Sequence, residues 1–257
     1  MKKGPEFGKS YKRSITEEYK QKGYVKFDEV IDPDEARGLG AELSGLILGK
    51  GNNAQWKGGF NSEEESTKAQ IFDMHDVQDH ETSGNFKRLL HDPRIMSRLS
   101  ILLGGPVILH HDKGFVKPRA TGDTYGGKFP PHQDYPFFPH ENYNMLAAIV
   151  YLTDITEDMG PVRVFPESHR NGPIEHLRTE NGTPYLDDAP YPLDEAVAVT
   201  GKAGDMVAFN LNTVHISGPN KSNRDRISWL LQVRGNGSKR VWGDTEPHEG
   251  EILWPSE

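Results

Sequence analysis

Short apolar runs separated by clusters of glycine, proline, asparagine and aspartate occupy the chain from Pro106 onward, and this pattern limits the folds that it can adopt. Many short strands bounded by turn residues are typical of an all-β sandwich or barrel, whereas β–α–β units would separate the strands by about 10–15 helical residues. We therefore predict a mainly β fold with flanking helices and a double-stranded β-helix (jelly roll) core. The runs lie at residues 107–110, 114–117, 145–152, 162–165, 196–199, 205–210 and 227–233.

Helical signals dominate the region before these runs. Asp32 followed by Pro33 is typical of a helix start, and apolar residues recur at helical spacing from 36 to 47. A second helical stretch extends from about 85 to 103 and is interrupted by Pro93, which predicts a new helix at that point because proline fits the first helical turn but not the interior. The N-terminal part is therefore expected to be mostly helical.

The chain has 257 residues, enough for one substantial core, and no repeat, low-complexity tract or linker divides it. We predict a single domain over residues 1–257. Its parts are a mostly helical segment at about 1–104, a jelly-roll core at about 105–235 and a C-terminal tail at 236–257.

Charge and cysteine content exclude several classes of function. The formal net charge is −8, whereas a nucleic-acid-binding protein normally has a basic face. The absence of cysteine excludes disulfides, cysteine-ligated metals and thiol catalysis. There is no apolar run of about 18 residues, and the charged start lacks the apolar stretch of a signal peptide. We expect a cytoplasmic protein that binds a small molecule and neither nucleic acid nor membrane; its oligomeric state has no signal in the sequence.

A pair of histidines and one carboxylate form a candidate metal site. His132 and Asp134 flank Gln133, and alternate residues of an extended segment project to the same side, so both can hold one ion. His215 follows on an apolar strand. Two imidazoles and one carboxylate with open positions are the ligand set of a mononuclear non-haem iron(II) site. Arg226, further along the chain, could hold an acidic cosubstrate.

Five blocks over nearly half of the chain resemble the phytanoyl-CoA dioxygenase family of iron(II)/2-oxoglutarate-dependent oxygenases. The order and spacing of the blocks carry the resemblance more than any single one. One departure is Glu167, where the family usually has glycine before Ser-His. The blocks are residues 115–118, 131–140, 151–154, 160–169 and 215–220, the last leading to Arg226-Ile227-Ser228.

The resemblance implies iron(II), with 2-oxoglutarate and O2 as cosubstrates, and no catalytic residue beyond the metal ligands. It implies hydroxylation, or another oxidation, of an unactivated carbon with release of succinate and CO2. In related halogenating enzymes a small residue replaces the carboxylate ligand, so Asp134 favours oxidation over chlorination. The implied iron ligands are His132, Asp134 and His215. The implied 2-oxoglutarate contacts are Arg226, Ser228 and Lys117.

Four residues are candidates for binding the substrate: Tyr135, Phe138, His140 and Arg163. The first three lie in an aromatic loop directly after the metal motif, where ordinary core packing is the alternative. Arg163 lies on a strand, where it faces either an anionic group or solvent.

The other histidines are interpreted as structural or exposed. His110 and His111 are adjacent on a strand and should point to opposite faces, which argues against a metal pair. His169 is expected to form hydrogen bonds in a turn. Polar surroundings predict exposure for His75, His80, His91, His176 and His248.

An iron(II)- and 2-oxoglutarate-dependent oxygenase is the leading hypothesis. The rival is a metal-binding cupin-like isomerase, or a ligand-binding protein without oxygenase activity. Cupin motifs usually supply His-x-His and a nearby glutamate, which this chain lacks around His132, and the presence of both Asp134 and Arg226 favours the oxygenase. The expected substrate is a small metabolite or natural product that is not linked to coenzyme A.

Overall fold

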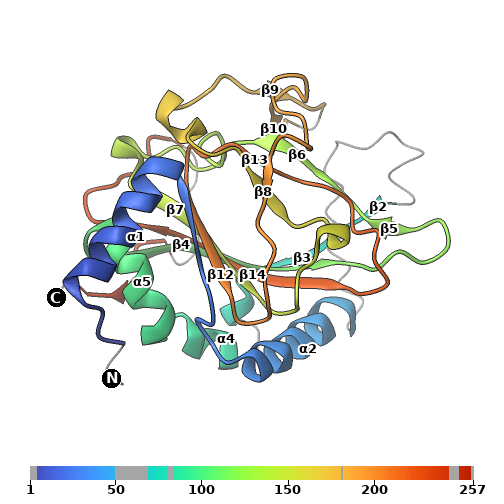
Figure 1. Ribbon diagram of the computed structural model, residues 1–257, viewed down its shortest axis with the longest axis horizontal. Coiled ribbons are helices and arrows are strands. Elements are labelled where there is room, and N and C mark those ends of the chain that lie inside the picture. The colour runs from blue at the N-terminus through green and yellow to red at the C-terminus, as the bar shows by residue number, and fades with distance from the viewer. Residues whose placement is uncertain (1–4, 50–68, 80–83, 181, 243–248, 256–257) are drawn as a thin grey trace.

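The computed structural model describes residues 5–49, 69–79, 84–180, 182–242 and 249–255 (Figure 1). Two antiparallel sheets face each other across an apolar cluster to form a jelly roll, and the predicted fold class is confirmed. The helices pack on the outer face of the larger sheet. They are α1 (Lys9–Lys22), α2 (Pro33–Gly49), α4 (Gly84–Leu89) and α5 (Pro93–Leu103).

The larger sheet has seven strands and the smaller has four. The larger sheet has the order β1 (Tyr24–Phe27), β12 (Met206–Asn210), β7 (Met145–Tyr151), β14 (Arg226–Arg234), β4 (Val107–Lys117), β15 (Ile252–Trp254), with β3 (Phe72–His75) also paired to β4. The smaller has β11 (Val197–Ala198), β8 (Val162–Val164), β13 (His215–Ser217) and β6 (Phe129–His132). Outside them, β2 (Ala69–Gln70) pairs with β5 (Tyr125–Gly126) and β9 (Leu177–Arg178) with β10 (Pro184–Tyr185). Short 3-10 helices are η1 (Val77–Asp79), η2 (Glu141–Tyr143), η3 (Glu157–Met159) and η4 (Ser168–Asn171).

Strand β14 separates two environments because alternate side chains of a strand point to opposite faces. On one face Trp229 is buried in the core beneath the helices, where it contacts Phe86 edge to face at 5.6 Å between ring centroids. The opposite face presents Arg226, Ser228 and Gln232 to the cavity between the sheets. Both faces of β14 are therefore covered, which explains why its sequence alternates only partly between polar and apolar residues.

The predicted helix starts are confirmed. Asp32 accepts hydrogen bonds from the backbone N–H groups of Asp34 and Glu35, at 2.9 and 3.1 Å, at the start of α2. Asp92 accepts one from the backbone of Arg94 at 2.8 Å, and Pro93 is the first residue of α5. These caps satisfy backbone donors that have no partner within the helix. The helical stretch predicted around Pro93 is accordingly two helices, α4 and α5.

Both ends of the chain add edge strands to the larger sheet, which the sequence did not indicate. In the mostly helical segment, β1 pairs with β12 and Val25 lies opposite Ala208. In the tail, β15 pairs with β4 and Ile252 lies opposite Ile108. A strand of three or four residues is stabilised mainly by its longer partner, so its own sequence pattern is too short to recognise. The division into one domain with three parts stays a prediction.

Gly23 joins α1 to β1 and holds the N-terminal segment against the turn that precedes His215. Its φ is +83°, in the left-handed region that favours glycine. Its carbonyl accepts hydrogen bonds from the backbone of Asn210 and the hydroxyl of Thr213, both at 2.8 Å. A Cβ atom here would lie 2.4 Å from Nδ1 of His169. Close approach and backbone angle together require glycine.

Glu167 has a φ of +69°, in the left-handed region that favours glycine, the residue expected here from the family resemblance. In the folded protein, the left-handed conformation costs a residue with a side chain about 1–2 kcal/mol compared with glycine. Glycine in turn stabilises the unfolded chain by up to roughly 1 kcal/mol, because its backbone is more flexible. We expect Glu167→Gly to raise the free energy of unfolding by about 1 kcal/mol and the Tm by about 2–4 °C, measured by calorimetry. The control is Glu175→Gly, which changes a residue with negative φ and should lower the Tm. Equal decreases of the Tm in both variants would show that the left-handed conformation of Glu167 does not destabilise the protein.

Candidate metal centre and cosubstrate cavity

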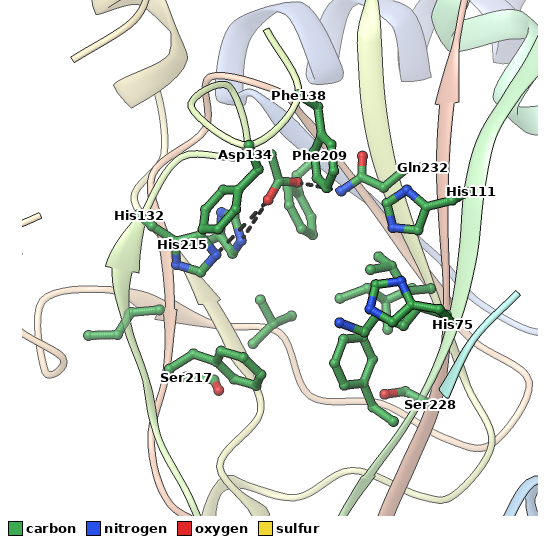
Figure 2. A pocket seen from close by; sticks show the side chains of 18 of the residues that line it. His75, His111, His132, Asp134, Phe138, Phe209, His215, Ser217, Ser228 and Gln232 are labelled. Atoms are coloured by element: carbon green, nitrogen blue, oxygen red, sulfur yellow. Dashed lines mark hydrogen bonds and ion pairs between the residues drawn. The ribbon is translucent and has the colours of Figure 1, made fainter. Parts of the chain in front are cut away.

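The three predicted metal ligands meet where β6 and β13 pair in the smaller sheet (Figure 2). His132 ends β6 and lies opposite His215, the first residue of β13, and their ring centroids are 4.1 Å apart. Asp134 follows β6 by two residues. Its Oδ1 atom lies 4.0 Å from Nε2 of His132 and 3.7 Å from Nε2 of His215. The register between two antiparallel strands thus brings together ligands that are far apart in sequence.

Hydrogen bonds from the other ring nitrogens set the tautomers of both histidines. Nδ1 of His132 lies 2.8 Å from the carbonyl of Pro130, and Nδ1 of His215 lies 3.0 Å from that of Thr213. A carbonyl only accepts, so each Nδ1 donates a proton and each Nε2 presents a lone pair. Burial, followed by the neighbouring His215, lowers the pKa of His132 well below its usual value and keeps it neutral. Two lone pairs and a carboxylate oxygen converge, which fits iron(II).

Gln232, on the opposite sheet, orients the carboxylate ligand. Its Nε2 donates to Oδ2 of Asp134 at 2.8 Å, which leaves Oδ1 directed at the two imidazoles. The Oε1 atom of the same amide is buried and has no hydrogen-bond partner in the described part of the chain. Sequence reasoning missed this residue. The signal was available, because Gln232 has the same parity on β14 as Arg226 and Ser228.

Loss of the Gln232 contact should loosen the metal site. Residues that orient a metal ligand typically contribute about 10–100-fold in affinity. We expect Gln232→Leu, which keeps the size of the side chain, to weaken iron(II) binding by about 10-fold or more. Anaerobic titration with iron(II) measures the change, with Gln78→Leu as a buried control away from the cavity. Unchanged iron affinity in Gln232→Leu would show that Asp134 is held by other contacts.

Arg226 and Ser228 lie on the wall of the larger sheet that faces the metal ligands. Arg226 is buried and donates to the carbonyl of Gly160, while its Nε has no hydrogen-bond partner among the described residues. No described carboxylate forms a salt bridge with it. Burial lowers the pKa of Arg226 to about 10, so it stays charged at neutral pH. A buried guanidinium without an acidic partner, beside a serine hydroxyl, fits the carboxylate of 2-oxoglutarate.

Lys117 is fully buried behind this wall. It lies opposite Arg226 in the register of β4 and β14, and its Nζ donates to the hydroxyl of Ser217 at 2.8 Å and the carbonyl of Gly218 at 2.7 Å. Burial and then the charge of Arg226 lower its pKa well below the usual value. Lys117 and Arg226 therefore lie beside the cavity without forming an ion pair to any described carboxylate, and of the two only Arg226 lines the cavity wall.

Binding of the 2-oxoglutarate dianion should raise the pKa of Lys117 and couple binding to proton uptake. Between the lowered pKa of the free protein and the higher pKa of the complex, the affinity should fall as pH rises. We expect the binding enthalpy to vary with the ionisation enthalpy of the buffer, in the sense of proton uptake, and Lys117→Met to abolish this variation. Calorimetry in two buffers at one pH is the measurement. Identical buffer dependence in both proteins would rule out Lys117 as the source.

One cavity of about 380 Å³ contains the metal ligands on one wall and the Arg226 wall on the other. Figure 2 shows His132, Asp134 and His215 across the cavity from Ser228, Gln232 and His111. Aromatic side chains line much of the rest and exclude water from the space between the walls. They are Phe115, Phe129, Phe137, Phe138 and Phe209.

Of the four predicted substrate residues, the structure places only Phe138 on the cavity wall. Tyr135 packs against Tyr143 at 5.5 Å between ring centroids. His140 is buried behind the wall, and its Nδ1 donates to the carbonyl of Phe138 at 2.9 Å. Arg163 donates to a carboxylate oxygen of Glu157 at 2.6 Å on the outside of the smaller sheet. Three of the four therefore lie away from the space where a substrate would meet the metal.

The expectation that His110 and His111 point to opposite faces is wrong. A β-bulge in β4 leaves His110 unpaired, because Gln232 lies opposite His111 while Val233 lies opposite Leu109. Their Nδ1 atoms are 2.8 Å apart, and His111 reaches the cavity wall. An extra residue shifts the alternation of side chains by one position, which the sequence pattern did not reveal.

The remaining histidines divide into three groups. His75 and His91 are exposed as predicted, although His75 also borders the cavity. As expected, His169 forms a hydrogen bond beside a turn, to the backbone carbonyl of Lys20 at 3.0 Å. His176 is half-buried, contrary to prediction, because its Nε2 accepts a hydrogen bond from the backbone of Gln133 at 3.0 Å. His80 and His248 lie outside the described residues.

Two histidines and a carboxylate within a jelly roll are typical of the non-haem iron(II)- and 2-oxoglutarate-dependent dioxygenases, and this protein is one of them. Enzymes of this class use O2 as a second cosubstrate. Residues 19–228 match the family model described as Phytanoyl-CoA dioxygenase (PhyH), and the chain belongs to this family. The rival hypothesis of a cupin-like isomerase or a binding protein without oxygenase activity receives no support.

Two curated relatives and one solved structure illustrate the similarity. A probable alpha-ketoglutarate-dependent hypophosphite dioxygenase of Stutzerimonas stutzeri is 26% identical, over 83% of this chain and 75% of the relative. An ectoine dioxygenase of Streptomyces anulatus is 27% identical, over 79% of this chain and 71% of the relative. The solved structure of the epimerase SnoN with Fe3+, alpha ketoglutarate and nogalamycin RO matches with a TM-score of 0.74 at 21% identity. The match covers 95% of this chain and 96% of that chain, and it shows that the two share a fold.

Proposed function

We propose that the protein hydroxylates an unactivated carbon of a small organic molecule while converting 2-oxoglutarate to succinate and CO2. One oxygen atom of O2 enters the product and the other enters succinate. The observation that carries the proposal is the shared cavity, with His132, Asp134 and His215 on one wall and Arg226 and Ser228 on the other.

The residues of the chain supply position and charge, while iron(II), 2-oxoglutarate and O2 supply the oxidising chemistry when bound. Arg226 offers two parallel N–H donors to a carboxylate, and Ser228 adds a hydroxyl from the same strand face. Three protein ligands leave open positions on an octahedral ion. Asp134 occupies the position that would be vacant for a halide, which supports oxygen transfer over chlorination.

The size of the cavity favours a small substrate. Ligand pockets typically span about 300–1,000 Å³, and this cavity of about 380 Å³ must hold both 2-oxoglutarate and the reacting part of the substrate. The relatives named for hypophosphite and ectoine also act on small molecules. We propose a small metabolite or natural product rather than a coenzyme A thioester.

The chemistry of the substrate side of the cavity indicates an amphipathic molecule. Phe137 and Phe138 provide an apolar surface, while the imidazoles of His75 and His111 are polar groups that border the same space. We infer a substrate with a polar group, able to form a hydrogen bond to an imidazole, close to the carbon that is oxidised.

A cytoplasmic location and a small-molecule partner are part of the same proposal. In the described segments no helix is long and apolar enough to cross a membrane.

Product analysis tests the proposed function. Protein with iron(II), 2-oxoglutarate and O2 is incubated with a panel of amphipathic small molecules and, separately, with acyl-coenzyme A thioesters. We expect slow succinate release without substrate, faster release with a matching small molecule, and one atom of 18O from 18O2 in the product. Anaerobic incubation is the control. Failure of the iron(II) protein to give the metal-to-2-oxoglutarate absorbance band would overturn the proposal, and turnover of thioesters alone would overturn the substrate class.

A further inference from the structure

A second group of possible metal ligands lies outside the cavity that holds the catalytic set. It consists of His110 on the bulge of β4, His140 in the loop after the metal motif, and Glu249 just before β15. One ligand atom from each lies within 4.8 Å of the others, which is also true of the three catalytic ligands. Both imidazoles are completely buried, and their ring centroids are 5.5 Å apart. The ligand atoms of the second group, like those of the first, are therefore close enough together to share one ion.

The ring nitrogen of His140 that faces Glu249 carries a lone pair. Nδ1 of His140 donates to the carbonyl of Phe138, so in the neutral ring Nε2 has no proton. This Nε2 lies 3.5 Å from Oε1 of Glu249. A lone pair and a carboxylate oxygen at this separation repel each other. A cation between them would convert the repulsion into binding.

Nε2 of His110 also lacks a hydrogen-bond partner among the described residues, as does Nε2 of His140. Buried polar atoms are nearly always paired, so two unpaired ring nitrogens in one cluster with a carboxylate need an explanation. Burial lowers the pKa of His110 to about 2 and also lowers that of His140. Both rings are neutral, as metal ligation requires.

A further residue positions the carboxylate. Nη1 of Arg240 lies 3.3 Å from Oε2 of Glu249, so Oε1 is the oxygen left for a ligand. In the same way, the hydrogen bond from Nδ1 of His140 to the carbonyl of Phe138 fixes the ring and leaves Nε2 for a ligand. Metal ligands in proteins are commonly held in this way by a second hydrogen bond on the far atom.

We propose that His110, His140 and Glu249 bind a second metal ion, of the zinc class, with water as the fourth ligand. Two imidazoles and a carboxylate suit zinc, whereas the iron(II) assignment of the catalytic set rests also on the Arg226 wall that faces it across the cavity. The three ligands come from β4, from the loop after β6 and from the C-terminal segment. The ion thus joins three parts of the chain behind the cavity wall that includes His111 and Phe138.

The proposed ion also determines which proton His111 presents to the cavity. Metal on Nε2 of His110 keeps its Nδ1 protonated, and this Nδ1 lies 2.8 Å from Nδ1 of His111. Nδ1 of His111 therefore accepts, and its Nε2 carries the proton. His111 becomes a fixed hydrogen-bond donor on the substrate side of the cavity.

The test uses the full-length His132→Ala/His215→Ala protein, in which the catalytic metal site is removed and zinc can report on the second site alone. We expect this protein to bind one equivalent of Zn2+ and its Tm to rise by about 5 °C at zinc concentrations far above the Kd. Adding Glu249→Gln, which removes the charge but keeps the shape, should abolish both effects. Cobalt(II) should give visible absorption typical of four-coordinate sites only where Glu249 is present.

The matched control is Glu251→Gln, which changes a more exposed glutamate two residues away and should bind zinc like its parent. Circular dichroism without zinc verifies that each variant is folded; if Glu249→Gln is not, His140→Gln replaces it. Absence of a zinc equivalent in the parent, or equal zinc binding in the folded Glu249→Gln or His140→Gln variant, overturns the proposal. Neither result depends on dioxygenase activity, so the proposed function is judged separately.

Discussion

Replacement of His132 by alanine should abolish iron binding and succinate formation. His132 is one of the three candidate ligands, and its Nε2 is held in place by the bond from Nδ1 to the carbonyl of Pro130. Residues that merely orient a ligand contribute about 10–100-fold, so loss of a ligand itself should weaken iron(II) binding by more than about 100-fold. Anaerobic iron(II) titration and succinate release in the absence of substrate measure the two effects.

The exposed residue His91 provides the control for this experiment. It lies in the turn between α4 and α5 and does not line the cavity, so His91→Ala should retain iron binding and turnover. A His132→Ala protein that still released succinate at the rate of the parent would show that the assignment of metal ligands is wrong, even if the enzyme class holds.

Replacement of Arg226 by glutamine should raise the KM for 2-oxoglutarate and leave the iron affinity almost unchanged. The guanidinium is buried without a salt bridge to any described residue, so an incoming carboxylate gains the full charge interaction. Removal of one partner from a buried charged pair typically costs about 2–5 kcal/mol, which corresponds to an increase of roughly 30-fold or more. Arg226→Lys should recover only part of the loss because an ammonium lacks the two parallel donors.

Arg119 is the matched control on the same side of the fold. It is exposed and pairs with Asp225, the residue before Arg226. Arg119→Gln should leave the KM for 2-oxoglutarate within about twofold, as is usual for surface charge pairs. If both variants raised the KM equally, the effect would come from disturbance of the β14 start and not from the carboxylate contact.

The clustering of the three candidate metal ligands was predictable because their geometry follows from local rules. His132 and Asp134 are two residues apart in extended backbone, and His215 is supplied by the neighbouring strand. The shared face of Arg226 and Ser228 was predictable because the pairing along β14 is regular up to the bulge, whereas their role as cosubstrate contacts came from the family resemblance and stays a prediction. The jelly roll itself followed from the strand pattern, and the starts of α2 and α5 followed from their aspartate caps.

The residues around the metal were less predictable because loops and bulges determine their direction. Tyr135, Phe138 and His140 share one loop, yet only Phe138 reaches the cavity. The bulge at His110 depends on pairing with β14, which no single segment reveals. The role of Gln232 required knowledge that β14 faces Asp134 across the cavity.

The central position of β14 has a consequence for the order in which the protein is made. This strand pairs with both β4 and β7, and it carries the cosubstrate contacts as well as the amide that holds Asp134. Synthesis proceeds from the N-terminus, so the helices, β1 and all three metal ligands leave the ribosome before Arg226 does. During that interval β4 and β7 have no partner between them, and the carboxylate ligand is not yet oriented. Iron binding by the candidate ligands should therefore be weaker before residues 226–234 have emerged than afterwards, because the contact from Gln232 to Asp134 is then still missing.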